Sequence, residues 1–188
     1  GIDARLLLCM MRGGTKEENK ETVELAHQYL GHYVVGLDLA GDELHYPCDL
    51  YEDEFALAKS YQIPFTIHAG ESKSIKNVED AIRFGARRLG HGVSLSRSKE
   101  LMDIVKKEGI LVECCLTSNL QTKEVLDIRQ HPIRKFFDYG IRVNLNSDNL
   151  TVSDTDIRKE TEIARNYLGF TDSEIKKMDD DALACSFR

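Results

Sequence analysis

Short apolar runs alternate with amphipathic stretches along the whole chain. The apolar runs are typical of buried strands, and each is closed by Gly or by polar residues; they cover residues 5–11, 34–39, 65–67, 87–89, 110–114 and 141–145. The other stretches have helical spacing and cover residues 17–30, 49–61, 78–84, 98–107, 131–140, 154–168 and 172–185. The pattern therefore predicts six strands separated by helices. We expect Asp154 to cap the helix over residues 154–168.

The strands recur at intervals of roughly 25–30 residues, which is the repeat of βα units and indicates a parallel sheet. Such a sheet is either doubly wound or part of a barrel. A doubly wound sheet is expected to carry a Gly-rich phosphate loop after its first strand. The segment Arg12-Gly13-Gly14-Thr15 in that place is a poor match to either nucleotide fingerprint.

Composition and charge narrow the class of protein. At 188 residues, with 41% hydrophobic and 30% charged residues, the chain is one globular domain. A net charge of −7 without a Lys/Arg block argues against binding to nucleic acid or to an anionic membrane. No apolar run approaches the roughly 18 residues that a membrane-spanning helix needs. The start Gly1-Ile2-Asp3 has neither an initiator Met nor a secretory signal, so we expect a fragment or a processed chain.

The five cysteines show neither the spacing of a disulfide framework nor that of a thiolate zinc site. Cys114 and Cys115 are neighbours, whose side chains would face opposite sides of a strand. We therefore expect reduced thiols and a cytoplasmic protein.

Polar and ionisable residues follow five consecutive predicted strands, at the point where each strand ends. In a (β/α) barrel these carboxyl-terminal ends form the rim on which the active site is assembled. Loops are polar in any protein, but five strand ends with two His and several acids favour a functional site on a barrel. In chain order the groups are Gly41-Asp42-Glu43, His68 and Glu71, His91, Thr117-Ser118-Asn119, and Asp148-Asn149.

The residue types at these ends suit a hydrolytic metal site. His68 and Asp148 offer nitrogen and oxygen ligands for Zn²⁺ or another divalent ion. A catalytic zinc usually keeps one place for water and lowers the pKa of that water to about 7. His91, between two glycines, could orient such a water or share its proton, and Glu71 could protonate a nitrogen if burial raised its pKa. The competing interpretation is structural: a strand-end His68, a buried His91 bonded to backbone, and a helix-capping Glu71.

Other polar residues are expected to have structural roles. Asp42 and Glu43 are interpreted as solvated loop acids or as salt-bridge partners of Arg87 or Arg88. Thr117-Ser118-Asn119 is expected to form a turn. His27 and His32 are expected on the surface, and His45 and His131 are expected to make structural contacts.

Taken together, the segments resemble those of the adenosine deaminases, within the metal-dependent hydrolase superfamily. One tetrapeptide alone is weak, but five in the same order, each after a strand, are specific, and the resemblance runs from about Arg5 to the end. The segments are Gly36-Leu37-Asp38-Leu39-Ala40-Gly41-Asp42-Glu43, His68-Ala69-Gly70-Glu71, Leu89-Gly90-His91-Gly92, Thr117-Ser118-Asn119 and Ser147-Asp148-Asn149. The resemblance implies a zinc enzyme with a TIM-type (β/α)₈ barrel that hydrolyses adenosine and 2′-deoxyadenosine to the inosine products and ammonia.

The resemblance also implies a role for each matching residue. His68 would be a zinc ligand, and Asp148 a second ligand that also takes a proton from the attacking water. Glu71 would protonate purine N1, and His91 would hold the attacking hydroxide and stabilise its charge. Gly41 would offer its backbone N–H to purine N3. Together these groups would be complementary to a tetrahedral adduct at C6.

Two departures from the family pattern affect these expectations, and the first is Asn149. Many members have Asp-Asp-Pro where this chain has Asp148-Asn149-Leu150, and the second acid meets purine N7. The amide N–H₂ of Asn149 can donate to N7, whereas a carboxylate would have to be protonated. We therefore expect Asn149 to bind substrate, with adenine or another aminopurine nucleoside as alternatives to adenosine.

The second departure is the absence of the His-x-His that supplies two further zinc ligands in the family. In addition, only six strands are predicted, two fewer than the eight of the family's barrel. We therefore expect residues 1–188 to be the C-terminal part of one (β/α)₈ domain, strands three to eight, with weak activity and doubtful zinc occupancy alone. Open sheet edges predict self-association. A non-catalytic module that keeps the fold but not the metal is the remaining alternative.

Overall fold

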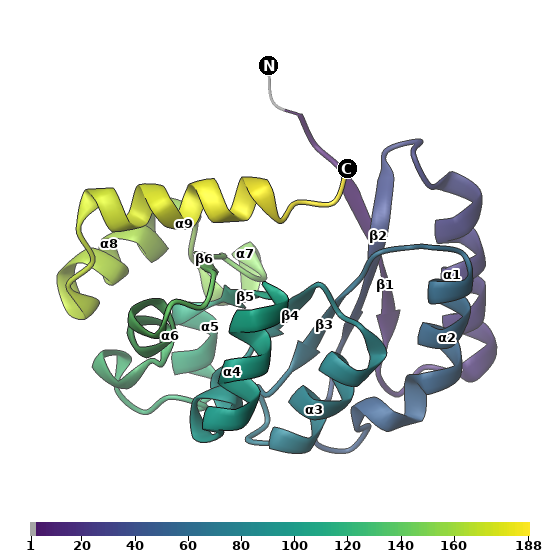
Figure 1. The fold of residues 1–188 in the computed structure, drawn as a ribbon, viewed down its shortest axis with the longest axis horizontal. Coiled ribbons are helices and arrows are strands. Elements are labelled where there is room, and N and C mark those ends of the chain that lie inside the picture. Colours follow the sequence, from purple (N-terminus) through teal and green to yellow (C-terminus); the bar gives the residue numbers. More distant parts are fainter. Residues whose placement is uncertain (1–2) are drawn as a thin grey trace.

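The computed structural model describes residues 3–188, and its strands and helices alternate along the chain (Figure 1). All six expected strands are present: β1 (Leu6–Met11), β2 (Val34–Ala40), β3 (Thr66–Ala69), β4 (Arg88–His91), β5 (Leu111–Cys114) and β6 (Val143–Leu145). The longer helices are α1 (Lys16–Tyr29), α2 (Glu52–Ser60), α3 (Ile75–Phe84), α4 (Lys99–Glu108), α6 (Ile133–Tyr139), α8 (Ile157–Leu168) and α9 (Asp172–Ala184). Shorter helical segments are η1 (Cys48–Tyr51), η2 (Val93–Arg97), α5 (Leu116–Gln121), η3 (Ile128–Gln130) and α7 (Leu150–Ser153).

The strands are parallel and neighbour one another in chain order. β1 pairs with β2, and β3, β4, β5 and β6 pair in succession. A parallel bridge between Leu37 and Phe65 joins the two groups. A doubly wound sheet would reverse its strand order at a switch point, whereas a barrel wall continues in order. Within residues 3–188 no pairing joins β6 to β1, so the chain forms six βα units of an open TIM-type barrel, as expected.

The apolar core lies between the strands and the helices that cover them. Successive side chains of a strand point to opposite faces, so every second strand residue enters this layer. Leu37, Ile67, Leu89 and Val112 are all fully buried there, together with Phe55 of α2. Each such side chain contributes about 1.5–3 kcal/mol on burial. This layer holds the strands in place and thereby fixes where their carboxyl-terminal ends lie.

The opposite strand face, which lines the barrel interior, carries a polar layer. The hydroxyl of Thr66 donates to Glu113 (2.7 Å), and Nε of Arg88 lies 3.0 Å from the other carboxylate oxygen of Glu113. Glu113 is therefore the partner of Arg88, so the alternative that Asp42 or Glu43 pairs with Arg88 was wrong. The three residues come from adjacent strands, β3, β4 and β5, at a depth where their side chains meet.

The C-terminal tail crosses the amino-terminal ends of the strands. Phe187 is 7% exposed, and the guanidinium of Arg88 lies 3.9 Å from the centre of its ring. A Cβ on Gly36 would come within 2.6 Å of this ring and of the carbonyl oxygen of Pro64. Gly36 is therefore required for close packing at the amino-terminal ends of the strands, on the side of the barrel opposite the predicted rim.

Three local predictions differ from the structure. α3 begins at Ile75, earlier than expected, because the Ser74 hydroxyl accepts the Asn77 N–H and caps the helix. Asp154 does not cap α8; it ends α7 in the left-handed region (φ 47°), and Asp156 accepts the first N–H groups of α8 instead. The segment 117–119, expected as a turn, lies in the short helix α5.

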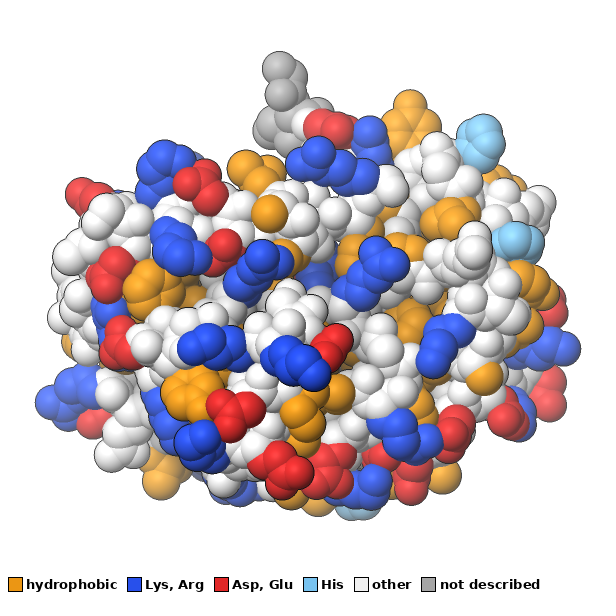
Figure 2. Space-filling view, in the orientation of Figure 1, with side chains coloured by type: hydrophobic (Ala, Val, Ile, Leu, Met, Phe, Trp, Pro, Cys, Tyr) orange, Lys and Arg blue, Asp and Glu red, His pale blue; other side chains and the backbone are white. Residues whose placement is uncertain are grey.

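The surface mixes both signs of charge. In the face shown in Figure 2, Lys and Arg side chains are interspersed with Asp and Glu. Among residues 3–188, every helix is too short or too polar to cross a bilayer. The five cysteines are all free.

Candidate active site

The predicted catalytic residues gather at the carboxyl-terminal ends of β3, β4 and β6. His68, His91 and Asp148 line one cavity of about 290 Å³, hereafter the polar cavity. Its other polar lining residues include Asp38 and Glu113. A larger hollow of about 650 Å³ lies at the opposite ends of the strands, between α3, α4 and the C-terminal tail. The polar cavity is the better candidate site because the imidazoles and carboxylates converge there.

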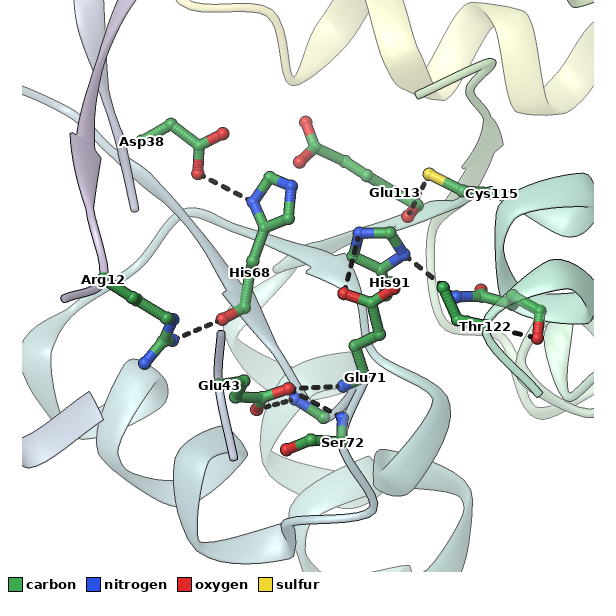
Figure 3. A network of polar contacts seen from close by, with 12 residues as sticks. Arg12, Asp38, Glu43, His68, Glu71, Ser72, His91, Glu113, Cys115 and Thr122 are labelled. Atoms are coloured by element: carbon green, nitrogen blue, oxygen red, sulfur yellow. Dashed lines mark hydrogen bonds and ion pairs between the residues drawn. The ribbon is translucent and has the colours of Figure 1, made fainter. Parts of the chain in front are cut away.

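His68 is oriented by a carboxylate from the neighbouring strand. Its Nδ1 lies 3.1 Å from Oδ1 of Asp38, on β2 (Figure 3). Burial, the largest single effect, lowers the pKa of His68. The hydrogen bond and charge of Asp38, together with the charges of Glu113 and Glu71, outweigh it and raise the pKa to about 9. A carboxylate that holds hydrogen on Nδ1 leaves Nε2 to face a metal ion, a common support for histidine ligands. Binding a cation through Nε2 would displace a proton.

His91 and Glu71 face each other across the rim. Nε2 of His91 lies 3.6 Å from Oε2 of Glu71, and the ring centres of His91 and His68 are 4.9 Å apart (Figure 3). His91 is only 2% exposed, and burial lowers its pKa to about 4, so its ring is neutral. The structure thus brings Glu71, His91 and His68 together in one contact group.

The Glu71 carboxyl has the protonation state that a general acid needs. Burial raises its pKa from 4.5 to about 7. The positive charge of His68 opposes this rise, and the negative charge of Asp148 adds to it. A carboxyl group with this pKa is partly protonated at neutral pH and can donate a proton. The role of Glu71 as a proton donor required that burial raise its pKa, and the surroundings of Glu71 do raise it.

The raised pKa of Glu71 is expected to make the free energy of unfolding of the metal-free protein depend on pH. Below pH 4.5 the carboxyl is neutral in both folded and unfolded chains, and above pH 7 the folded chain holds a buried carboxylate. Wild type should therefore lose up to about 3 kcal/mol relative to Glu71→Gln as the pH rises from 4.5 to 7. Urea unfolding in EDTA across this range measures the difference. A constant difference between the two proteins would contradict it.

The loop that carries Glu71 is held by Glu43. The carboxylate of Glu43, 4% exposed, accepts the backbone N–H groups of Gly70, Glu71 and Ser72 at 2.5–2.8 Å (Figure 3). The expectation that Glu43 is a solvated acid was therefore wrong. Its neighbour Asp42 is exposed and bonds only within its own loop, so the same expectation was right for Asp42.

Removal of the Glu43 carboxylate is expected to destabilise this loop. Three N–H donors would lose a charged acceptor, so Glu43→Ala should lower the free energy of unfolding by roughly 3 kcal/mol. Urea denaturation followed by circular dichroism measures the change. Glu79→Ala, at an exposed position of α3, is the control and should cost less than about 1 kcal/mol. Equal effects of the two substitutions would refute this role for Glu43.

Two of the predicted catalytic residues have left-handed backbone. His91, the last residue of β4, has φ 62°, and Asp148, three residues beyond the end of β6, has φ 56°. Residues with a side chain rarely adopt this region, and such conformations cluster at functional sites. The chain turns sharply at both residues, which aims their side chains into the polar cavity.

Two sets of residues could hold a divalent cation. His91, Cys115 and Asp148 each place a ligand atom within 4.8 Å of the others, and His68 lies outside that tight set. Burial, however, raises the pKa of the Cys115 thiol well above its ordinary value, which disfavours the thiolate that a metal needs. The other set is His68 with Asp148: the hydrogen bond of Asp38 to Nδ1 leaves Nε2 of His68 to face a cation, which would displace the proton that the raised pKa of His68 holds there.

The two expected substrate contacts, Gly41 and Asn149, are not among the residues that line the polar cavity. Gly41 has φ 110°, and a Cβ there would approach Arg12 to 3.2 Å, so glycine is required. Arg12 in turn donates to the carbonyl oxygen of His68 (2.7 Å). Asn149 caps α7 by accepting the Val152 N–H through Oδ1, which leaves its amide N–H₂ free.

Sequence reasoning missed the residues that support the site. Asp38 holds His68, and Asn119 contacts Nδ1 of His91 at 3.0 Å. His131, expected to be merely structural, is buried and contacts Asn119. A charged residue between Leu37 and Leu39 inside an apolar strand was the available signal for Asp38, since a buried charge requires a partner. No comparable signal marked His131.

Solved structures share this fold. The N6-methyl-AMP deaminase of Arabidopsis thaliana, without ligand, and Arabidopsis ADAL complexed with IMP each superpose with a TM-score of 0.90 at 30% identity, over 98% of this chain and 54% of theirs. A Burkholderia ambifaria amidohydrolase with bound Zn superposes with a TM-score of 0.91 at 22% identity, over 100% of this chain and 53% of that one, which shows the fold alone. These likenesses identify the fold as that of a TIM-type (β/α) barrel enzyme, with the candidate site on the carboxyl-terminal rim.

Sequence comparison gives the family. The sequence model described as "Adenosine deaminase" matches residues 1–188. The adenosine deaminase of Enterococcus faecalis is 40% identical over 187 residues, which cover 100% of this chain and 56% of that protein. The chain belongs to the adenosine deaminase family. It spans about half the length of the curated relatives it matches.

Proposed function

We propose that this chain, together with the family's His-x-His segment (hereafter the completed protein), hydrolyses adenosine and 2′-deoxyadenosine to inosine and 2′-deoxyinosine with release of ammonia. The observation that carries the proposal is the contact between a buried acid of raised pKa, Glu71, and a buried neutral imidazole, His91, at 3.6 Å. Deamination needs an acid for the ring nitrogen beside the attacked carbon and a group that holds the attacking oxygen. Membership of the adenosine deaminase family supports the same reaction.

Each step can be assigned to a side chain. Glu71 protonates purine N1, which makes C6 electrophilic. Water adds to C6 while His91 holds its oxygen and Asp148 accepts its proton. That proton passes to the amino group, the C6–N6 bond breaks, and ammonia leaves as N1 keeps the hydrogen it received. The hydrogen left on the C6 oxygen is released to solvent as the carbonyl forms, and Glu71 takes up one proton from solvent, so that one water is consumed in all.

Zinc is proposed as the cofactor, held by His68 and Asp148 with the two imidazoles of the His-x-His segment. When bound, it would supply a Lewis acid that makes water nucleophilic near neutral pH. The substrate is oriented by two further groups: the backbone N–H of Gly41 at N3 and the free amide N–H₂ of Asn149 at N7. Neither contact needs a change in the capping bond that Asn149 makes through Oδ1.

Adenine nucleoside 5′-monophosphates are the second candidate substrates. The observation that favours them is the 30% identity to the Arabidopsis N6-methyl-AMP deaminase and to ADAL complexed with IMP. Initial rates of the completed protein on adenosine, 2′-deoxyadenosine, AMP, N6-methyl-AMP and adenine separate the candidates. The proposal expects the two nucleosides to have the highest kcat/KM. A preference for a monophosphate or for adenine would replace adenosine as the substrate.

Two further properties are proposed for the isolated chain. The open edges of β1 and β6 favour self-association, which size-exclusion chromatography with light scattering would detect as a dimer or larger species. Five free thiols fit a reducing compartment such as the cytoplasm.

A further inference from the structure

Three buried polar side chains form a hydrogen-bonded chain behind the polar cavity. His91, Asn119 and His131 are 2%, 0% and 3% exposed. Nδ1 of His91 lies 3.0 Å from Nδ2 of Asn119, and Oδ1 of Asn119 lies 3.2 Å from Nε2 of His131. The chain ends at a main-chain group, because the backbone N–H of Ile133 reaches Nδ1 of His131 at 3.2 Å.

The backbone end of the chain fixes the direction of its hydrogen bonds. A backbone N–H can only donate, so Nδ1 of His131 is an acceptor without hydrogen. Burial lowers the pKa of His131 to about 3, so its ring is neutral and carries its single hydrogen on Nε2. This Nε2–H must donate to Asn119, which places the amide oxygen of Asn119 toward His131. The amide N–H₂ of Asn119 then points at His91.

The direction of these hydrogen bonds also fixes the hydrogen position on His91, the candidate catalytic imidazole. Nδ1 of His91 accepts from the Asn119 amide, so a neutral His91 carries its hydrogen on Nε2. Nε2 is the atom that faces Glu71. We infer that the Ile133–His131–Asn119 chain sets the tautomer of His91 and makes its Nε2–H a hydrogen-bond donor in the active site. Asn119 and His131 are thus positioning residues.

Two consequences follow for the chemistry, the first of which rests on the proposed function. A resting His91 with hydrogen on Nε2 donates to the attacking oxygen and cannot take a proton from it, so the base is Asp148. Independently of the reaction, both ring nitrogens of His91 are occupied, Nε2 by hydrogen and Nδ1 by Asn119. The set of His91, Cys115 and Asp148 then lacks a free imidazole lone pair, so a cation would need His68 instead.

The tautomer can be measured directly on the metal-free chain. Protein labelled with ¹⁵N in histidine gives long-range ¹H–¹⁵N spectra in which the protonated and bare ring nitrogens of each His are distinct. The signals of His91 are assigned by their loss in His91→Gln. We expect the hydrogen of His91 on Nε2 at neutral pH. A wild-type His91 with its hydrogen on Nδ1, or with the two forms equally populated, would overturn the inference.

Asn119→Asp tests the cause of this tautomer. A carboxylate can only accept, so the hydrogen of His91 should move from Nε2 to Nδ1, where it donates to the new carboxylate. Asn166→Asp, an exposed position on α8, is the matched control and should leave the His91 signals unchanged. A folded Asn119→Asp protein with His91 still protonated on Nε2 would refute the inference. If this variant does not fold, the wild-type spectrum still decides.

These spectra need no substrate and no metal, so the two proposals can fail separately. A bare Nε2 on His91 would end the inference and leave deamination open to test. A completed protein without deaminase activity would leave the tautomer result intact.

Discussion

Glu71→Gln is expected to lower the rate of deamination by the completed protein about a thousandfold, within the usual range for loss of a general acid. The amide keeps the size of the side chain but cannot protonate purine N1, so C6 stays weakly electrophilic. Because the loss falls on a proton transfer in the transition state, it should appear in kcat with little change in KM. Formation of inosine, followed by chromatography, measures both constants.

The control for this substitution is Glu21→Gln, on the exposed face of α1 and outside the polar cavity. It should leave kcat unchanged. Zinc content should be equal in both variants and in wild type, because Glu71 is not proposed as a ligand. If Glu71→Gln retained activity within a factor of ten, Glu71 would not be the acid. A completed wild-type protein without any deaminase activity would instead favour the non-catalytic module.

The isolated 188-residue chain is expected to deaminate adenosine about a thousandfold more slowly than the completed protein. His68 and Asp148 alone supply two ligands, whereas a catalytic zinc usually has at least three from the protein. Loss of the metal removes several kcal/mol of transition-state stabilisation, which corresponds to a rate change of this order. Zinc per chain after dialysis, measured by mass spectrometry beside inosine formation, should fall in parallel with activity.

Addition of the His-x-His segment, co-expressed from a relative, should restore both zinc and turnover. The same segment with both of its histidines replaced by Ala is the control, and it should restore the closed barrel without the metal. Robust turnover by the 188 residues alone would show that two ligands suffice. Turnover with the Ala-containing segment would show that closure of the barrel, not zinc, is what the chain lacks.

The sequence was most informative about the strands and helices, whose hydrophobic positions repeat every few residues. Alternation of apolar runs with helical spacing predicted all six strands, because each run must bury a face against the next helix. The rim was predictable for the same reason, since parallel strands bring their ends to one side. Residues such as His68 and His91 could therefore be expected to be neighbours before their distance of 4.9 Å was known.

Partners far apart in the sequence could not be predicted. Glu43 accepts from Gly70, 27 residues later, and Asn119 meets His91, 28 residues earlier. Nothing in the local sequence of either partner specifies such a pair, because the pairing depends on how the strands and loops pack. Local choices also failed where two similar residues compete, as when Asp156 rather than Asp154 caps α8.

The central claim is that His68 and Asp148 hold one cation beside Glu71 and His91. Anomalous scattering at the zinc edge, from crystals of the completed protein soaked in Zn²⁺, locates that ion directly. The account predicts one strong peak against Nε2 of His68 and the carboxylate of Asp148, in the polar cavity. A peak on Cys115 and His91, or one away from these strand ends, would contradict it.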